Sequence, residues 1–166
     1  MHALIVLSII VGVNILVWVI IIHFIKKRAA SQVESFGTVD ASLTYGKAVA
    51  GPGHSHYIGT TVNGFRYFAK GYWARGTGSV VLTDRALIIK RKGLSNPAVI
   101  PLQSITELQR RKSFAGRHLF KPVVTVIMWE MGGGDFETGI VLGRNEETHS
   151  RWESAISAYR QKSEKA

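Results

Sequence analysis

The sequence contains no cysteine, and its 11 aspartates and glutamates are outnumbered by 21 lysines and arginines among 166 residues. The lack of cysteine excludes a disulfide framework, a cysteine-ligated zinc or iron–sulfur site, and thiol catalysis. The shortage of acidic side chains gives a formal net charge of +10 and leaves few carboxylates for acid–base chemistry. A chain of this length fits one ordinary domain and has little room for a second.

Formal charge is also absent from the long apolar run between Leu4 and Ile25. A helix of this length reaches about 33 Å, enough to cross a hydrocarbon core of about 30 Å. Lys26, Lys27 and Arg28 follow the run, whereas a cleaved signal peptide carries its positive charge before the apolar run. We therefore expect residues 1–28 to form an uncleaved single-pass anchor in the cell membrane. Because cationic residues stay on the cytoplasmic side, its N-terminus should lie outside.

Three residues inside the run are suited to contact with a partner helix. Ser8 and Gly12 are four positions apart, a spacing of small residues that permits close helix packing. Asn14 falls near the middle of the membrane, where an unpaired amide is costly and favours a polar partner. The alternative is a span without a partner, in which the small residues and the amide are simply tolerated.

The remaining chain divides into a tether and a β-rich domain. Residues 29–56 are rich in small and polar side chains and include Gly51-Pro52-Gly53, so we expect a tether there and a globular domain over 57–166. The alternation of apolar and turn residues predicts about seven short, mainly antiparallel strands. The eight candidate segments, of which the first two are interrupted by glycine, are 57–62, 65–72, 80–83, 86–90, 99–100, 105–108, 123–129 and 136–142.

The pattern changes at Asn145, which is expected to cap a C-terminal helix with acidic residues in its first turn. Four apolar residues follow at i, i+3, i+4 and i+7 and predict one buried stripe. They are Trp152, Ala155, Ile156 and Tyr159. An α+β fold of strands closed by one amphipathic helix follows from this pattern.

Strands followed by one helix with an inward-facing tryptophan are the plan of pleckstrin-homology-like (PH-like) domains. The hairpin GSVVLTDRALIIK over 78–90, followed by AVIPLQSITEL, resembles a pattern of bacterial PH-like and GRAM-like domains. Nearly the whole chain is similar to actinobacterial single-span membrane proteins with such a domain. The matching motifs are Tyr57-Ile58-Gly59-Thr60-Thr61, Met128-Trp129-Glu130, Thr138-Gly139 and Trp152.

The resemblance implies a split β-barrel capped by the C-terminal helix and a membrane-tethered module without enzymatic activity. It does not imply a ligand, because the basic motif of phosphoinositide-binding relatives cannot be placed in this chain.

Basic residues are concentrated between positions 66 and 121, a segment that contains twelve lysines and arginines but only two acidic residues, Asp84 and Glu107. Two basic clusters, the second of which has interleaved aromatic residues, predict a cytoplasmic contact surface for anionic lipid headgroups. The candidate residues are Lys90, Arg91, Lys92, Arg110, Arg111, Lys112, Phe114, Arg117, Phe120 and Lys121. One alternative is a scaffold that recruits a membrane-associated protein, as an accessory subunit of an export or cell-envelope complex. A merely solvated basic face is the other.

The residue patterns that metal binding, catalysis and nucleic-acid binding require are missing from the sequence. His54 and His56 have no carboxylate at metal-ligand spacing, and no nucleophile–base arrangement is visible. The glycine-rich segments lack the lysine of a phosphate-cradling loop. Nucleic-acid-binding motifs are also missing. We therefore expect no enzymatic activity, no cofactor, no metal and no nucleic acid partner.

Overall fold

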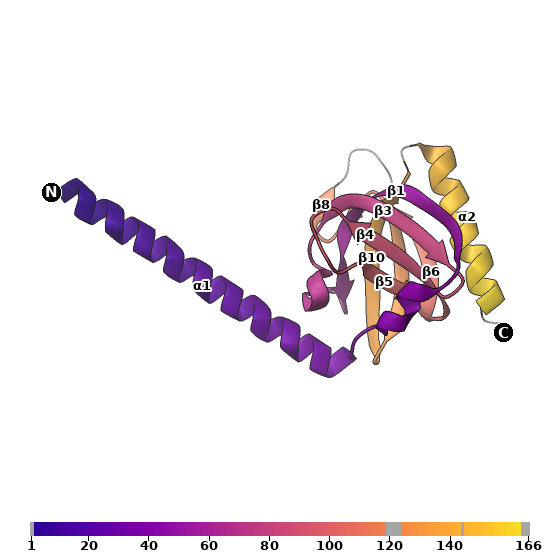
Figure 1. Ribbon diagram of the computed structural model, residues 1–166, viewed down its shortest axis with the longest axis horizontal. Coiled ribbons are helices and arrows are strands. Elements are labelled where there is room, and N and C mark those ends of the chain that lie inside the picture. Colours follow the sequence, from indigo (N-terminus) through magenta and orange to yellow (C-terminus); the bar gives the residue numbers. More distant parts are fainter. Residues whose placement is uncertain (1, 119–123, 144, 164–166) are drawn as a thin grey trace.

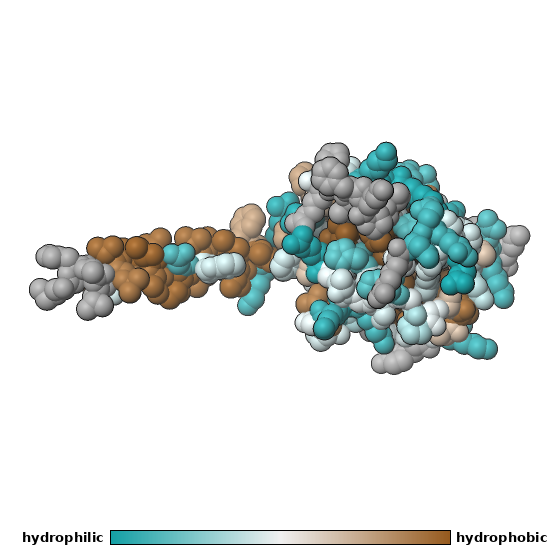
Figure 2. All heavy atoms as spheres, turned by 90° about the horizontal axis from the view of Figure 1, so that it is seen from above, coloured by the Kyte–Doolittle hydropathy of each residue, from teal (hydrophilic) through white to brown (hydrophobic). Residues whose placement is uncertain are grey.

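The computed structural model describes residues 2–118, 124–143 and 145–163, and it consists of a long N-terminal helix attached to a β-rich domain (Figure 1). Helix α1 extends from His2 to Phe36, and from Ile5 onward it is long and apolar enough to cross a membrane. Residues 5–24 are all exposed, and Figure 2 shows hydrophobic residues concentrated along this helix. An apolar surface around the whole helix is typical of a lipid-facing segment.

The domain is built on one curled, open sheet in which all strand pairs are antiparallel. Its strand order is β5-β4-β3-β1-β10-β9-β6, and the short β2 also pairs with β1. A separate hairpin is formed by β7 and β8. The bounds are β1 Ala48–Val62, β2 Phe65–Arg66, β3 Gly76–Thr83, β4 Ala86–Arg91, β5 Ala98–Pro101, β6 Ile105–Arg111, β7 Ser113–Phe114, β8 Arg117–His118, β9 Val124–Met131 and β10 Gly134–Leu142.

The sheet confirms the expected fold: a long apolar N-terminal helix, an antiparallel sheet, and one C-terminal helix, α2, over Glu146–Ser163. The β3–β4 and β9–β10 hairpins lie where the sequence predicts them. The expected strand over 65–72 is wrong beyond Arg66, since Ala69–Gly71 form a 3-10 turn, η2, with Lys70 at a φ of 47°. That left-handed residue interrupts the extended backbone, and the chain then returns to β1, where the Tyr72 carbonyl accepts a hydrogen bond of 3.1 Å from the Thr60 amide.

Strand β1 begins inside the segment expected to be a tether. Residues 29–36 continue α1, Ala41–Tyr45 form a 3-10 turn (η1), and β1 starts at Ala48. The expectation of an irregular segment failed because β1 is held by backbone pairing with β3 rather than by an alternating side-chain pattern. Gly53 also lets the sheet approach the helix, since a Cβ there would lie 2.5 Å from Cζ2 of Trp152.

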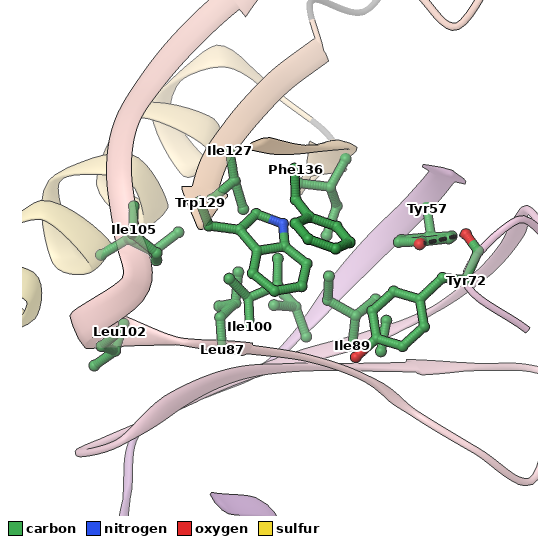
Figure 3. Packing of buried hydrophobic residues seen from close by; sticks show 14 of the residues in the cluster. Tyr57, Tyr72, Leu87, Ile89, Ile100, Leu102, Ile105, Ile127, Trp129 and Phe136 are labelled. Carbon is green, nitrogen blue, oxygen red and sulfur yellow. Dashed lines mark hydrogen bonds between the residues drawn. The ribbon is translucent and has the colours of Figure 1, made fainter. Parts of the chain in front are cut away.

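Aromatic side chains form the centre of the core (Figure 3). Trp129 and Phe136 stack with their ring centroids 4.4 Å apart, above Leu87 and Ile100. The Tyr57 hydroxyl donates a hydrogen bond of 2.6 Å to the carbonyl oxygen of Tyr72. This satisfies a buried hydroxyl and fixes the loop before β3 against β1.

Helix α2 closes one side of the core, opposite α1 (Figure 1). Its Trp152 and Ile156 are buried and Ala155 and Tyr159 pack beside them, which confirms the predicted stripe. Asn145 caps the helix as expected, because its Oδ1 accepts a hydrogen bond of 2.9 Å from the Thr148 amide.

Candidate functional site

The last two turns of α1 are packed against the domain. The Gln32 amide group makes two hydrogen bonds to the segment that follows β1: it donates to the Arg66 carbonyl at 2.9 Å and accepts from the Phe68 amide at 2.7 Å. Phe36 meets Phe136 edge to face at 5.7 Å between ring centroids. Because Gln32 is only 8% exposed, α1 and the domain are joined by a buried contact rather than by a free linker.

An aromatic cluster surrounds Arg28, the last of the three basic residues after the apolar run. The Arg28 guanidinium carbon lies 5.8 Å from the ring centroids of both Phe65 and Phe68. The Phe68 ring is in turn 6.2 Å from Trp73. Phe65 is 64% exposed and Trp73 is 43% exposed, so part of this cluster faces away from the protein.

A small pocket opens beside this cluster. Its volume is about 110 Å³, and it is lined by Ile58, Gly59, Thr60, Arg66, Trp73, Arg75 and Ala115. The β-sheet register shifts between Tyr57 and Gly59, and Ile58 and Gly59 at this bulge line the pocket. Arg66 and Arg75 are exposed and make no ion pair with any residue that the structure describes. The pocket therefore combines two uncompensated guanidinium groups with an indole, which suits a small anion.

Arg91 holds the loop that carries Trp73 and Arg75. Its guanidinium donates to the carbonyl oxygens of Gly71 at 2.5 Å, Ala74 at 3.0 Å and Asn96 at 2.9 Å. It also lies 4.8 Å from the ring centroid of Tyr57. Burial lowers the pKa of Arg91, and burial raises the pKa of the Tyr57 hydroxyl. Arg91 is only 4% exposed, so it shapes the pocket and is not available to a ligand.

The cluster around Arg110 is also used within the fold. The Arg110 side chain bonds to Glu153 at 2.7 Å, to the Ser150 hydroxyl at 2.9 Å and to Glu146, all on α2. Arg111 pairs with Glu137 of β10 at 3.1 Å. Both arginines have carboxylate partners, and Arg110 attaches α2 to β6.

The Glu153 carboxylate is the centre of this contact between α2 and the sheet. It accepts a hydrogen bond of 2.8 Å from Thr125, whose hydroxyl lies 2.6 Å from His149 Nε2. Burial pushes the pKa of Glu153 upward, but hydrogen bonds from Arg110 and Thr125 outweigh it and lower the pKa below its usual value. The ionised carboxylate is therefore part of the folded structure at neutral pH.

The expected basic and aromatic surface is thus only partly present. Lys90, Lys92 and Lys112 are exposed, as a contact surface requires. Phe114 was expected to be exposed but is buried, since it packs against Ile58 and the β9–β10 hairpin. Arg117 belongs to β8, whereas Phe120 and Lys121 lie outside the described residues.

The candidate contact residues within α1 lie on two faces of the helix. Ser8 and Gly12 share one face, and Asn14 is about 200° around the helix from Gly12. The Asn14 amide donates a hydrogen bond of 2.8 Å to the Ile10 carbonyl. One partner helix cannot contact all three residues, so the small-residue face and Asn14 are separate predictions.

The residues that sequence reasoning missed are Arg66, Trp73 and Arg75. The two arginines belong to the basic segment 66–121 but lie outside its clusters, and Trp73 is isolated from both clusters in the sequence. The signal in the sequence is a pair of arginines on either side of four aromatic residues, just before the first strong hairpin. Only the turn at η2 brings them to one pocket.

The antiparallel sheet closed by one C-terminal helix is the plan of a PH-like domain, here preceded by an apolar helix. A family model described as bacterial PH domain-like matches residues 33–157, so the chain belongs to this family. The match indicates no enzymatic family. No curated protein matches the sequence.

Among solved structures, a similar one is described as "Vav1 inhibited by an allosteric inhibitor: Vav1 inhibitors block GEF activity". The similarity covers 81% of this chain at 17% sequence identity, with a TM-score of 0.40. The chain spans 32% of the length of that structure.

Proposed function

We propose that this protein is a non-enzymatic, single-pass membrane protein whose PH-like domain binds the anionic headgroups of phospholipids. The ligand site is the pocket lined by Arg66, Trp73 and Arg75, which we name the arginine pocket. The orientation follows from Lys26, Lys27 and Arg28, with the domain on the cytoplasmic side of the cell membrane. The recruited ligand is therefore a lipid of the inner leaflet.

The observation that carries this proposal is the pair of uncompensated arginines at the arginine pocket. An arginine fork binds phosphate through two parallel hydrogen bonds, which are stronger than bonds between neutral groups. A volume of about 110 Å³ has room for a phosphate group but not for acyl chains. The pocket therefore suits a headgroup presented at a membrane surface.

The position of the arginine pocket along α1 supports the same conclusion. The Arg66 carbonyl is bonded to Gln32, which is seven residues and about 10.5 Å along the helix axis beyond Ile25, where the apolar run ends. The headgroup layer of a bilayer is about 5–8 Å thick on each side. The pocket thus lies beside the outer edge of the headgroup layer of the leaflet next to which α1 ends.

The exposed lysines of the originally expected surface have a supporting role in this proposal. Lys90, Lys92 and Lys112 add positive charge around the domain, and each charge near an anionic bilayer contributes about 1 kcal/mol. These charges concentrate anionic lipid without selecting a headgroup. Selection depends on the arginine pocket.

The proposal is tested with the full chain in neutral detergent micelles. The fluorescence of the Trp18→Phe chain, in which Trp73 is the exposed indole, is followed during titration with short-chain phosphatidic acid, inorganic phosphate or short-chain phosphatidylcholine. We expect a saturable response to phosphatidic acid that weakens with salt, and little response to phosphatidylcholine. The double variant Arg66→Gln/Arg75→Gln should weaken binding at least about tenfold, because each arginine bond to phosphate contributes about 1.5–3 kcal/mol.

A matched control removes the same charge at the opposite end of β3. Lys47→Gln/Arg85→Gln changes two exposed cations that do not line the arginine pocket, and it should bind phosphatidic acid normally. Equal affinity of the Arg66→Gln/Arg75→Gln variant and the unchanged chain would contradict the proposed site. No response to any anionic probe would favour the alternative, in which the domain recruits a protein partner.

A further inference from the structure

The aromatic cluster around Arg28 has no role in the arginine pocket beyond the indole of Trp73. We name its members, Phe65, Phe68 and Trp73, the aromatic edge. Among the described residues beyond α1, the large hydrophobic side chains that are clearly exposed are Phe65, Trp73 and Leu94. Two of these three belong to the aromatic edge. Exposed aromatic side chains gathered at one place mark a contact surface.

The aromatic edge lies at the level where the apolar part of α1 ends. The uncharged run ends at Ile25, and Arg28 is three residues further along the helix, or about 4.5 Å. The Phe65 and Phe68 rings contact Arg28 directly. With α1 across a bilayer, these rings fall inside the headgroup layer, which extends about 5–8 Å beyond the hydrocarbon. Aromatic side chains are enriched at this depth because their rings suit a boundary between apolar and polar surroundings.

The aromatic edge is also prevented from moving away from that level. Gln32 bonds to both Arg66 and Phe68, which lie on either side of Tyr67. The Tyr67 ring packs edge to face on Phe136 at 5.0 Å, and Phe36 contacts the same ring. These contacts join the edge, the end of α1 and the core into one unit. The direction of α1 therefore determines which face of the domain meets the bilayer.

We propose that Phe65 and Trp73 insert into the headgroup layer of the same bilayer that α1 crosses, so that the domain docks in cis on that leaflet. Phe68, half-buried between Arg28 and Trp73, supports the two inserted rings from behind. This inference deepens the proposed function and rests on its membrane-spanning α1. It does not require phosphate binding, since aromatic insertion is driven by burial of apolar surface and not by lipid charge.

The test uses tryptophan quenching by brominated lipid in the full chain. Trp18 lies in the apolar part of α1, so Trp18→Phe removes its signal. Trp129 and Trp152 are buried in the domain, which leaves Trp73 as the exposed indole. In neutral phosphatidylcholine vesicles that contain brominated lipid, we expect clear quenching of the Trp18→Phe chain. The added change Trp73→Phe should abolish that quenching.

A second variant tests whether the contact between α1 and the domain holds Trp73 in the headgroup layer. Gln32→Ala in the Trp18→Phe background removes the hydrogen bonds to Arg66 and Phe68 that hold the aromatic edge against α1, and it should reduce the quenching. Gln109→Ala is the matched control, because that amide bonds only within β6 and at its end, to Glu107 and Arg111. Circular dichroism verifies that each variant is folded. Equal quenching with and without Trp73 would overturn the proposal.

The two proposals fail in different ways. Arg66→Gln/Arg75→Gln, added to Trp18→Phe, should keep the quenching in neutral vesicles although it weakens binding of phosphatidic acid. Quenching without headgroup binding would contradict only the arginine pocket as a ligand site. Headgroup binding without quenching of Trp73 would contradict only the docking of the aromatic edge, and would leave that edge to a protein partner.

Discussion

Replacement of Arg91 by methionine is the perturbation whose effect follows most directly from the structure. The Arg91 guanidinium bonds to three backbone carbonyls, two in the loop at Gly71 and Ala74 and one in the turn at Asn96. Its Nε is buried and has no acceptor in the part of the chain that the structure describes. Methionine retains much of the apolar stem but makes none of these bonds.

The expected loss in the free energy of unfolding is smaller than the summed contributions of the three hydrogen bonds. A hydrogen bond to a charged group contributes about 1.5–3 kcal/mol, which for three bonds gives roughly 4.5–9 kcal/mol. Removal of the charge also removes the cost of burying it, which amounts to several kcal/mol. Gly71 and Ala74 are half-buried and Asn96 is exposed, so water can replace part of the lost bonding. We therefore expect Arg91→Met to lower the free energy of unfolding by about 2–4 kcal/mol, a large part of the 5–15 kcal/mol of a typical domain.

Urea unfolding of the full chain in neutral micelles measures this loss, and hydrogen exchange locates it. Protection should fall most at residues 71–75, which carry Trp73, and binding of phosphatidic acid should weaken with it. Lys90→Met is the matched control, since Lys90 is exposed on the same strand and should change stability by less than about 0.5 kcal/mol. Equal stability of the two variants, or unchanged exchange at 71–75, would refute the assigned role of Arg91.

Three further expectations can be measured directly. Gly53→Ala places a Cβ against the Trp152 indole and should cost about 1–3 kcal/mol in urea unfolding, whereas Gly76→Ala meets only ordinary contacts; equal losses would contradict this. The lowered pKa of Glu153 stabilises the fold above the usual carboxyl pKa, so the deficit of Glu153→Gln should shrink as the pH falls from about 6 to below 4; a constant deficit would argue against an ionised native carboxylate. With Ser154→Cys as the only thiol, an impermeant maleimide should label the protein in opened cells but not in intact cells. Labelling in intact cells would contradict the predicted cytoplasmic position of the domain.

Most of the fold was predictable because its signals are local. The hairpins β3–β4 and β9–β10 alternate apolar residues around short turns, and the stripe of α2 repeats at helical spacing. The first half of β1 was missed because its glycine- and proline-containing sequence has no such alternation. It becomes a strand by pairing with β3 and by packing under Trp152, which are contacts over long distances in the sequence.

The candidate site was less predictable for a similar reason. Runs of basic residues are visible in a sequence, but whether each side chain meets lipid or a carboxylate depends on what packs beside it. Arg110 meets α2 from 36 to 43 residues away, and Arg91 meets the loop 17 and 20 residues before it. Arg66 and Arg75, which are not part of any run, are the ones that converge on a pocket.

The sequence by itself determined the apolar helix, the basic residues after it and the mainly antiparallel fold, since hydropathy and short-range periodicity encode all three. Tertiary structure decided which lysines and arginines remain available to bind a ligand. Ion pairs and burial depend on packing between residues that are distant in the chain. It also decided how the domain is joined to α1: Gln32 and Phe36, which look like linker residues, are part of the folded unit. Their partners, Arg66, Phe68 and Phe136, are brought to the end of α1 only when the sheet folds.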